Sequence, residues 1–104
     1  MNNKKSDLTV ATEILRQLGG RKFLAMTGCK NLLGGDNHLQ MHLAKNKSKA
    51  KYLTITLDVF DTYTMTFNYL SKGYKLIEVA EYTGVYFDQL QAIFTKVTGL
   101  YTSL

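Results

Sequence analysis

The residues best placed to do chemistry in this sequence are four lysines in the segment KNKSKAK. Lys45, Lys47, Lys49 and Lys51 occupy every second position of that segment. Side chains of an extended ribbon alternate between two sides, so the four ammonium groups would project from the same side. Ammonium groups bind phosphate oxygens as point charges and carry no base information. We therefore predict a non-catalytic binding site for nucleic acid, DNA or RNA, although lysine-rich turns are often simply solvated.

Further basic and aromatic residues would enlarge this site if the fold brought their loops together. Arg21, Lys22 and Lys30 would add positive charge beside the lysine segment. Tyr52 and Tyr74 would be able to stack on bases. These residues match no standard RNA-binding aromatic motif, so the sequence predicts phosphate contact more strongly than base recognition.

The charge of the chain is unevenly distributed. The formal net charge is +5, from 13 Lys and Arg against 8 Asp and Glu. Residues 1–52 hold ten basic and three acidic residues, for +7, and residues 53–104 hold three and five, for −2. Such an imbalance is typical of a basic face that meets a polyanion, and it also keeps a small protein in solution.

Metal and thiol chemistry have one candidate set each. Asp36, His38 and His42 would project from the same face of a strand, and two histidines with a carboxylate suit zinc or iron. A fourth ligand is not evident, so we predict no metal and no cofactor. Cys29 would need an activating base to act as a nucleophile, and no such base is identifiable. Catalysis, the third hypothesis for function, would require Cys29, His38 and His42 in one pocket.

The C-terminal tail follows a glycine helix stop at Gly99 and contains three apolar residues, Leu100, Tyr101 and Leu104. These side chains either fold back onto the last helical turn or form an exposed patch. An exposed patch would suit a second copy of the chain or a host protein. The tail is therefore our candidate protein-interaction site.

Two amphipathic helices are predicted near the ends of the chain. The first spans residues 8–18 and ends at Gly19 and Gly20, and the second begins near Tyr86 and ends before Gly99. Apolar residues recur in both at spacings of three and four. They are Ala11, Ile14, Leu15 and Leu18 in the first helix, and Phe87, Leu90, Ile93, Phe94 and Val97 in the second.

Alternating apolar and polar residues predict strands between these helices. Four stretches carry the pattern: residues 38–44, 52–57, 63–69 and 74–82. Thr83 and Gly84 should end the last of them. A fifth strand at residues 21–27 is favoured over a helical turn because Phe23 lies in a short apolar run bounded by glycines. Residues 28–37 read as a loop, with Leu32 and Leu33 anchored in the core.

These elements predict an α+β fold in a single domain, residues 1–104, with a flexible N-terminus at residues 1–6. Short links between strands favour an antiparallel meander of four to five strands, and the two helices should pack on its apolar face. No apolar run reaches the roughly 20 residues that cross a bilayer. A lone cysteine and the absence of a secretory signal lead us to expect the cytoplasm.

Three segments resemble a family of small uncharacterised proteins encoded by bacteriophages, prophages and other mobile elements. They are Gly19-Gly20 with residues 25–28 (AMTG), the DxYxxxF pattern from Asp61 to Phe67, and the YFDQL and TGLYTSL motifs at residues 86–90 and 98–104. Alanine is usual in that family at the position of Cys29, which argues against a shared nucleophile. The resemblance implies a bacterial host cytoplasm and no known activity. It also suggests an alternative function, modulation of a host protein such as a defence system.

Overall fold

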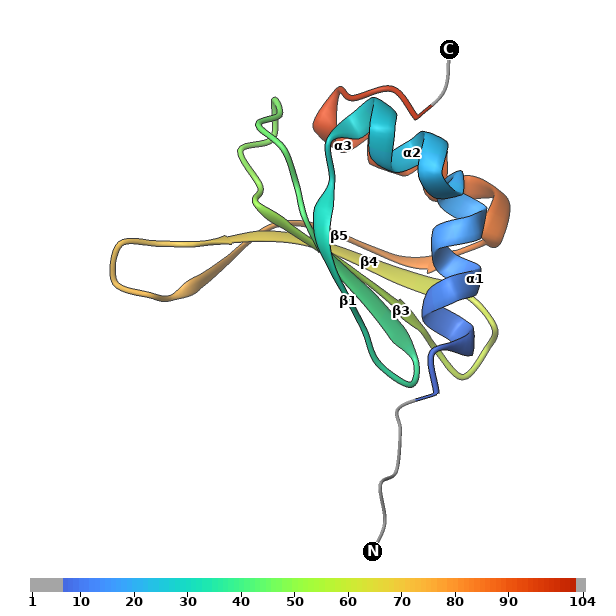
Figure 1. Cartoon of the computed structure of the whole chain (residues 1–104). Coiled ribbons are helices and arrows are strands. Elements are labelled where there is room, and N and C mark those ends of the chain that lie inside the picture. Colours follow the sequence, from blue (N-terminus) through green and yellow to red (C-terminus); the bar gives the residue numbers. More distant parts are fainter. Residues whose placement is uncertain (1–6, 103–104) are drawn as a thin grey trace, which may run out of the picture.

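The helices and strands follow one another in the order of Figure 1, a computed structural model that describes residues 7–102. The helices are α1 (Thr9–Leu18), α2 (Gly20–Thr27) and α3 (Leu90–Thr98), and a 3-10 turn, η1 (Phe87–Gln89), precedes α3. The strands are β1 (Lys30–Gly34), β2 (His38–His42), β3 (Tyr52–Leu57), β4 (Tyr63–Leu70) and β5 (Leu76–Val85). The expected flexibility of residues 1–6 and the expected role of Leu104 fall outside the described residues. None of the helices in this range is long and apolar enough to span a membrane.

The five strands form one antiparallel sheet in the order β1-β2-β3-β4-β5, which confirms the predicted meander. All three helices lie on the same side of it (Figure 1). The helix-covered face is apolar, as alternation predicts. Polar residues occupy the opposite face, where a row in register runs from Gln40 through Thr54 and Thr66 to Glu81.

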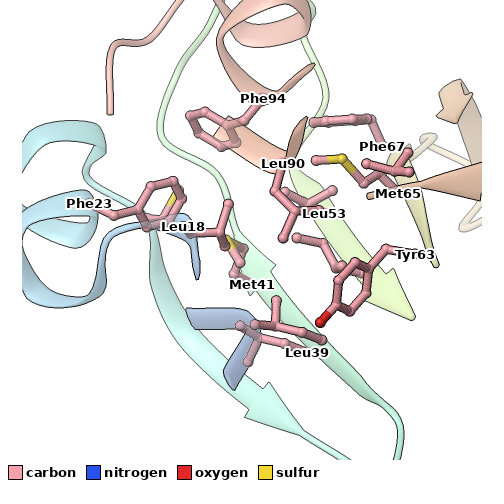
Figure 2. Packing of buried hydrophobic residues seen from close by; sticks show 14 of the residues in the cluster. Leu18, Phe23, Leu39, Met41, Leu53, Tyr63, Met65, Phe67, Leu90 and Phe94 are labelled. Carbon is pink, nitrogen blue, oxygen red and sulfur yellow. The ribbon is translucent and has the colours of Figure 1, made fainter. Parts of the chain in front are cut away.

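The core lies between the helices and the covered face of the sheet. Figure 2 shows side chains from both layers meeting in one cluster. Phe23 of α2 and Phe94 of α3 are fully buried, and their rings meet edge to face with centroids 5.0 Å apart. Burial of a large aromatic side chain contributes about 1.5–3 kcal/mol, so this pair fixes the two helices to each other as well as to the sheet.

The preference for a strand at residues 21–27 is wrong, because this segment forms α2. Phe23 and Thr27 are buried, whereas Ala25 midway between them is exposed. A helix separates Ala25 from the other two, but a strand would place all three side chains on the same face. The Thr27 hydroxyl donates to the Phe23 carbonyl at 2.7 Å. Gly28 then adopts a left-handed conformation (φ 73°) and its N–H bonds the Leu24 carbonyl, which ends the helix.

The loop predicted at residues 28–37 is also wrong in part, since Lys30–Gly34 pairs with β2 as an edge strand. Leu32 and Leu33 are not anchored in the core, and Leu33 is 61% exposed. The strand lacks a regular alternation of apolar and polar residues, because its register is irregular between Lys30 and Leu33 and Asn31 has a positive φ. An edge strand with a bulge shows little of the alternation that identifies a buried strand.

The last strand continues past the predicted stop at Thr83 and Gly84. Its pairing with β4 contains two irregularities, one opposite Tyr63–Met65 and one opposite Phe67–Asn68. Gly84 has φ 63° and therefore accommodates the extra residue of the first irregularity without breaking the strand. At its N-terminal end the strand is shorter than predicted, because residues 71–75 form the turn and β5 begins at Leu76.

Candidate nucleic-acid interface

The sheet separates charge from one end to the other. In a meander, successive loops lie at alternate ends, so the links β2–β3 and β4–β5 share one end with the start of β1. We call this the basic end, and it carries seven lysines: Lys30, Lys45, Lys47, Lys49, Lys51, Lys72 and Lys75. The loops at the opposite end, residues 35–37 and 58–62, hold Asp36, Asp58 and Asp61 and no lysine or arginine.

The link between β2 and β3, residues 43–51, is the lysine loop, and a single asparagine organises it. The Asn46 amide donates to the Ala44 carbonyl at 2.8 Å and to the Ala50 carbonyl at 2.9 Å. Its carbonyl oxygen accepts bonds from the Ser48 backbone N–H and hydroxyl. The Ser48 hydroxyl oxygen in turn accepts from the Ala50 N–H at 3.0 Å. Sequence analysis missed Asn46, although Asn and Ser in a turn are typical of this local bonding.

Backbone bonds close the lysine loop on itself and tie it to two neighbouring elements, β4 and α3. Leu43 donates to Lys51 and Lys51 donates to Asn68, each at 2.8 Å, so both ends of the loop continue the sheet. In the middle, the Lys47 N–H donates to the Thr98 carbonyl at 3.1 Å, one of the open carbonyls at the C-terminus of α3. The loop is therefore anchored at its ends and at its centre.

The four lysines of the loop converge for a different reason from the one predicted. The segment is not an extended ribbon, because residues 47–48 form a turn and Lys49 has φ 67°. The side chains of all four lysines nevertheless line one pocket of about 560 Å³, together with Leu43, Ala44, Asn46 and Ala50. All four are exposed. Within residues 7–102 the one ion pair joins Arg16 to Glu13, so no described carboxylate neutralises the loop.

Lys47 has a structural contact in addition to its charge. A Cβ atom on Gly99 would lie 3.1 Å from the Lys47 Cδ, so the aliphatic stem of this lysine covers the end of α3. Gly99 itself has a left-handed conformation with φ 77°, which caps the helix. A cation near a helix C-terminus is also favoured by the helix dipole. Lys45, Lys49 and Lys51 are thus the lysines whose charge is most available to a ligand.

The structure brings only part of the predicted outer patch to this site. Lys30 is opposite His42 in the sheet, and His42 is opposite Tyr52, so Lys30 lies at the basic end. Arg21 and Lys22 belong to the first turn of α2, whereas its far end, at Gly28, is the part that approaches Ala44. Lys22 lies six positions before Gly28, a distance of about 9 Å along the helix axis.

The residues proposed for catalysis do not form one pocket. Cys29 is buried at 6% exposure, and burial raises the pKa of its thiol, which disfavours the reactive thiolate. The Nδ1 of His42 lies 3.1 Å from the Asn31 amide, and the His42 ring meets Tyr52 edge to face. His38 is at the other end of β2, about 13 Å along the strand. No group of three potential metal ligands occurs in the described part of the chain.

The C-terminal tail packs on the helix that precedes it. Leu100 is half-buried against the core, its N–H donates to the Thr98 hydroxyl, and its carbonyl accepts from the Thr95 hydroxyl at 2.9 Å. Tyr101 is 71% exposed. The folded-back arrangement therefore holds for Leu100, and Tyr101 alone of the described tail residues remains available as a large apolar contact.

Comparison with known proteins offers no relative from which a function can be transferred. No family model, no curated protein and no solved structure matches the chain. The functional inference consequently depends on the charge, order and exposure of the lysine loop.

Proposed function

We propose that this protein is a non-catalytic binding module that contacts the phosphate backbone of DNA or RNA through the lysine loop, within the cytoplasm of a bacterial host cell. The observation that carries the proposal is the convergence of Lys45, Lys47, Lys49 and Lys51 on one pocket without a neutralising carboxylate among the described residues. The predicted relationship to mobile-element proteins is consistent with this setting.

The fixed backbone of the lysine loop supports the proposal, as its charge does. Asn46 and the bond from Lys47 to Thr98 fix the loop backbone before any ligand arrives. A ligand therefore does not have to order the loop, which lowers the entropic cost of binding. Only the lysine side chains still lose rotamer freedom.

Recognition through this loop should be largely independent of base sequence. Lysines contact phosphates as point charges, and such contacts position a nucleic acid without reading it. Tyr52, the nearest aromatic residue on the polar sheet face, is half-buried and meets His42 at a centroid distance of 4.8 Å, so it does not offer a free stacking surface. Binding should consequently be governed by counterion release.

A matched pair of charge variants tests the proposal. Fluorescence anisotropy is measured with labelled single- and double-stranded oligonucleotides over a range of potassium chloride concentrations. Lys45→Gln/Lys49→Gln removes two charges from the loop, and Arg21→Gln/Lys22→Gln removes two from α2. If both loop lysines contact phosphates, the slope of log affinity against log salt should become shallower by about 1.8 on duplex or about 1.4 on a single strand. The α2 variant should retain the wild-type slope.

Two results would contradict nucleic-acid binding through this loop. One is the absence of binding to every DNA and RNA probe at low salt. The other is an equal loss of affinity in the two variants, which would mean that only the total charge of the chain matters. Both variants change exposed side chains, so thermal unfolding by circular dichroism should show them folded.

A second candidate function, inhibition or modulation of a host protein, is favoured by the tip of the β3–β4 loop. Val59 is 89% exposed and Phe60 is 83% exposed. Asp58 holds this tip in shape, because its carboxylate accepts bonds from the Phe60 N–H and from the Thr62 hydroxyl. A rigid, exposed apolar pair is typical of a protein contact.

Affinity capture from host lysate distinguishes this second function from the first. The wild-type protein and Val59→Ser/Phe60→Ser are compared, each with and without nuclease treatment. A partner that survives nuclease and is lost in the variant would support a protein target. Captured proteins that disappear with nuclease would instead indicate a nucleic-acid bridge.

A further inference from the structure

The lysine loop encloses a pocket and is not a flat basic surface. It stands at one end of the sheet beside the C-terminus of α3 (Figure 1). The pocket volume of about 560 Å³ lies within the range of roughly 300–1,000 Å³ that is usual for sites that enclose a small molecule. All the residues that line it belong to the loop itself, from Leu43 to Lys51. Such a pocket admits a group that protrudes into it, whereas a continuous strand passes more easily across its mouth.

The backbone of the loop offers few hydrogen-bond donors to a ligand, because most of its N–H groups already donate within the protein. The residues whose N–H groups are engaged in this way are Leu43, Lys47, Ser48, Lys49, Ala50 and Lys51. Phosphate-binding nests, in contrast, use free backbone N–H groups. In this loop the lysine ammonium groups must supply the contacts, so recognition depends on the charge of the ligand.

The charge of the pocket is concentrated. Four lysines line it, and none of them forms an ion pair within residues 7–102. Like charges gathered at one site repel one another, and a bound anion relieves this repulsion. Each internal phosphate of a strand carries a single negative charge. A phosphate monoester carries about −1.5 to −2 at pH 7 and presents three acceptor oxygens, so a terminal phosphate complements the pocket better than an internal one.

We propose that the lysine loop binds a terminal phosphate group, a monoester or a polyphosphate, in preference to internal phosphodiesters. The terminal group enters the pocket between the four lysines, and the phosphates that follow it along a strand meet the other lysines of the basic end. This preference rests on the proposed phosphate binding, because it names the part of the nucleic acid that the loop holds. A free nucleotide presents the same group, so the two sources need separate measurements.

Strands that differ only in one terminal phosphate test the preference. Fluorescence anisotropy compares a short single strand that has a 5′-phosphate with the same strand that has a 5′-hydroxyl, both labelled at the 3′ end. A second pair, with the label at the 5′ end, compares a 3′-phosphate with a 3′-hydroxyl. A charge-assisted contact to the terminal phosphate should raise the affinity of the wild-type protein about tenfold for at least one of the two ends. In Lys45→Gln/Lys49→Gln the ratio of affinities should fall to within about twofold.

Lys72→Gln/Lys75→Gln is the matched control. It removes the same charge from the same end of the sheet, but neither lysine belongs to the residues that line the pocket. This variant should keep the wild-type ratio even if its overall affinity falls. The substituted side chains are exposed in both variants, so thermal unfolding by circular dichroism should show them folded.

Inorganic triphosphate and ATP separate the two sources of a terminal phosphate. Inorganic triphosphate should raise the Tm of the wild type and of the control variant, and it should leave the Tm of Lys45→Gln/Lys49→Gln unchanged. ATP that displaces the labelled strand more effectively than the unlabelled phosphorylated strand does would identify a free nucleotide as the preferred source. Weaker competition by ATP would identify the end of a strand, and either result supports a terminal-phosphate site.

Equal affinity for phosphorylated and unphosphorylated ends would overturn the preference and leave the proposed backbone contact intact. A preference that survives in Lys45→Gln/Lys49→Gln, or that the control variant loses to the same extent, would overturn its placement in the pocket. Binding of inorganic triphosphate without binding of any strand would support the pocket and refute the proposed nucleic-acid function. The absence of both would refute the two together.

Discussion

Replacement of Asn46 by alanine should destabilise the protein although every lysine is retained. The side chain donates to the Ala44 and Ala50 carbonyls and accepts two bonds from Ser48. A hydrogen bond contributes about 0.5–1.5 kcal/mol net to stability. The four bonds share one residue, and the half-buried loop can recruit water, so the full sum is not expected. We predict a loss of about 2–3 kcal/mol in the free energy of unfolding.

Chemical and thermal unfolding followed by circular dichroism measures this loss. A change of 2–3 kcal/mol corresponds to a fall of roughly 10–20 °C in Tm for a domain of this size. Amide hydrogen exchange locates the effect, because the Leu43 N–H closes the loop and the N–H groups of Lys47 and Lys51 bond α3 and β4. Their protection should fall more than that of Leu53 or Ile55 in β3.

Asn37→Ala provides the matched control, because Asn37 lies in the β1–β2 loop at the opposite end and is exposed. Among the described residues its side chain hydrogen-bonds the His38 ring alone, at 3.4 Å, so its removal should change stability by less than about 0.5 kcal/mol. An Asn46→Ala variant as stable as Asn37→Ala, with unchanged exchange at Lys47, would refute the assigned role of Asn46. Weaker oligonucleotide binding by Asn46→Ala would show that loop order contributes to affinity.

Three further predictions concern the helix cap, the opposite end of the sheet and the thiol. Gly99→Ala should lower the free energy of unfolding by about 1–2 kcal/mol, because a left-handed residue with a Cβ is strained and the new atom meets Lys47. Gly73→Ala, in an open turn, should change it little. Urea unfolding of the two variants measures the difference. The bonds to Asp58 from the Phe60 N–H and Thr62 hydroxyl lower the pKa of this carboxyl, so its contribution to stability is present above about pH 4 and is lost as the pH falls through the folded pKa. Asp58→Asn should therefore flatten the decline of the urea midpoint below pH 4, and an unchanged decline would contradict this role. Cys29 should react slowly with Ellman's reagent at pH 8 until the chain is unfolded, because the thiol is buried and its pKa is raised; rapid reaction of the native protein would show that α2 opens.

The parts of the fold that could be predicted from sequence are those with one buried and one exposed face. In β3, Leu53 and Ile55 are fully buried while Thr54 between them is half-buried on the polar face, so alternation identifies the strand. The same logic succeeds for α1, whose buried residues recur at helical spacing. It fails where both sides of a segment are exposed, as at Leu33 in β1.

The lysine loop could be predicted as a charge cluster but not as a shaped site. Alternating lysines are visible in the sequence, whereas their convergence depends on four bonds made by Asn46 and on docking of Lys47 to the end of α3. The expected contribution of Arg21 depended on the direction of α2, which is set by the contact of Phe23 with Phe94. Contacts between residues distant in the sequence leave no periodic pattern to read.

The lysine loop and the β4–β5 hairpin share the basic end of the sheet but differ in the balance of their charges. They are close in the fold, because the Lys51 N–H bonds the backbone of Asn68 in β4. In the hairpin, Lys72 and Lys75 are followed by Glu78 and Glu81, so these four charges sum to zero. The lysines of the loop have no described carboxylate to neutralise them. Counterions should therefore gather chiefly at the lysine loop, and the salt dependence of phosphate binding should follow the loop lysines.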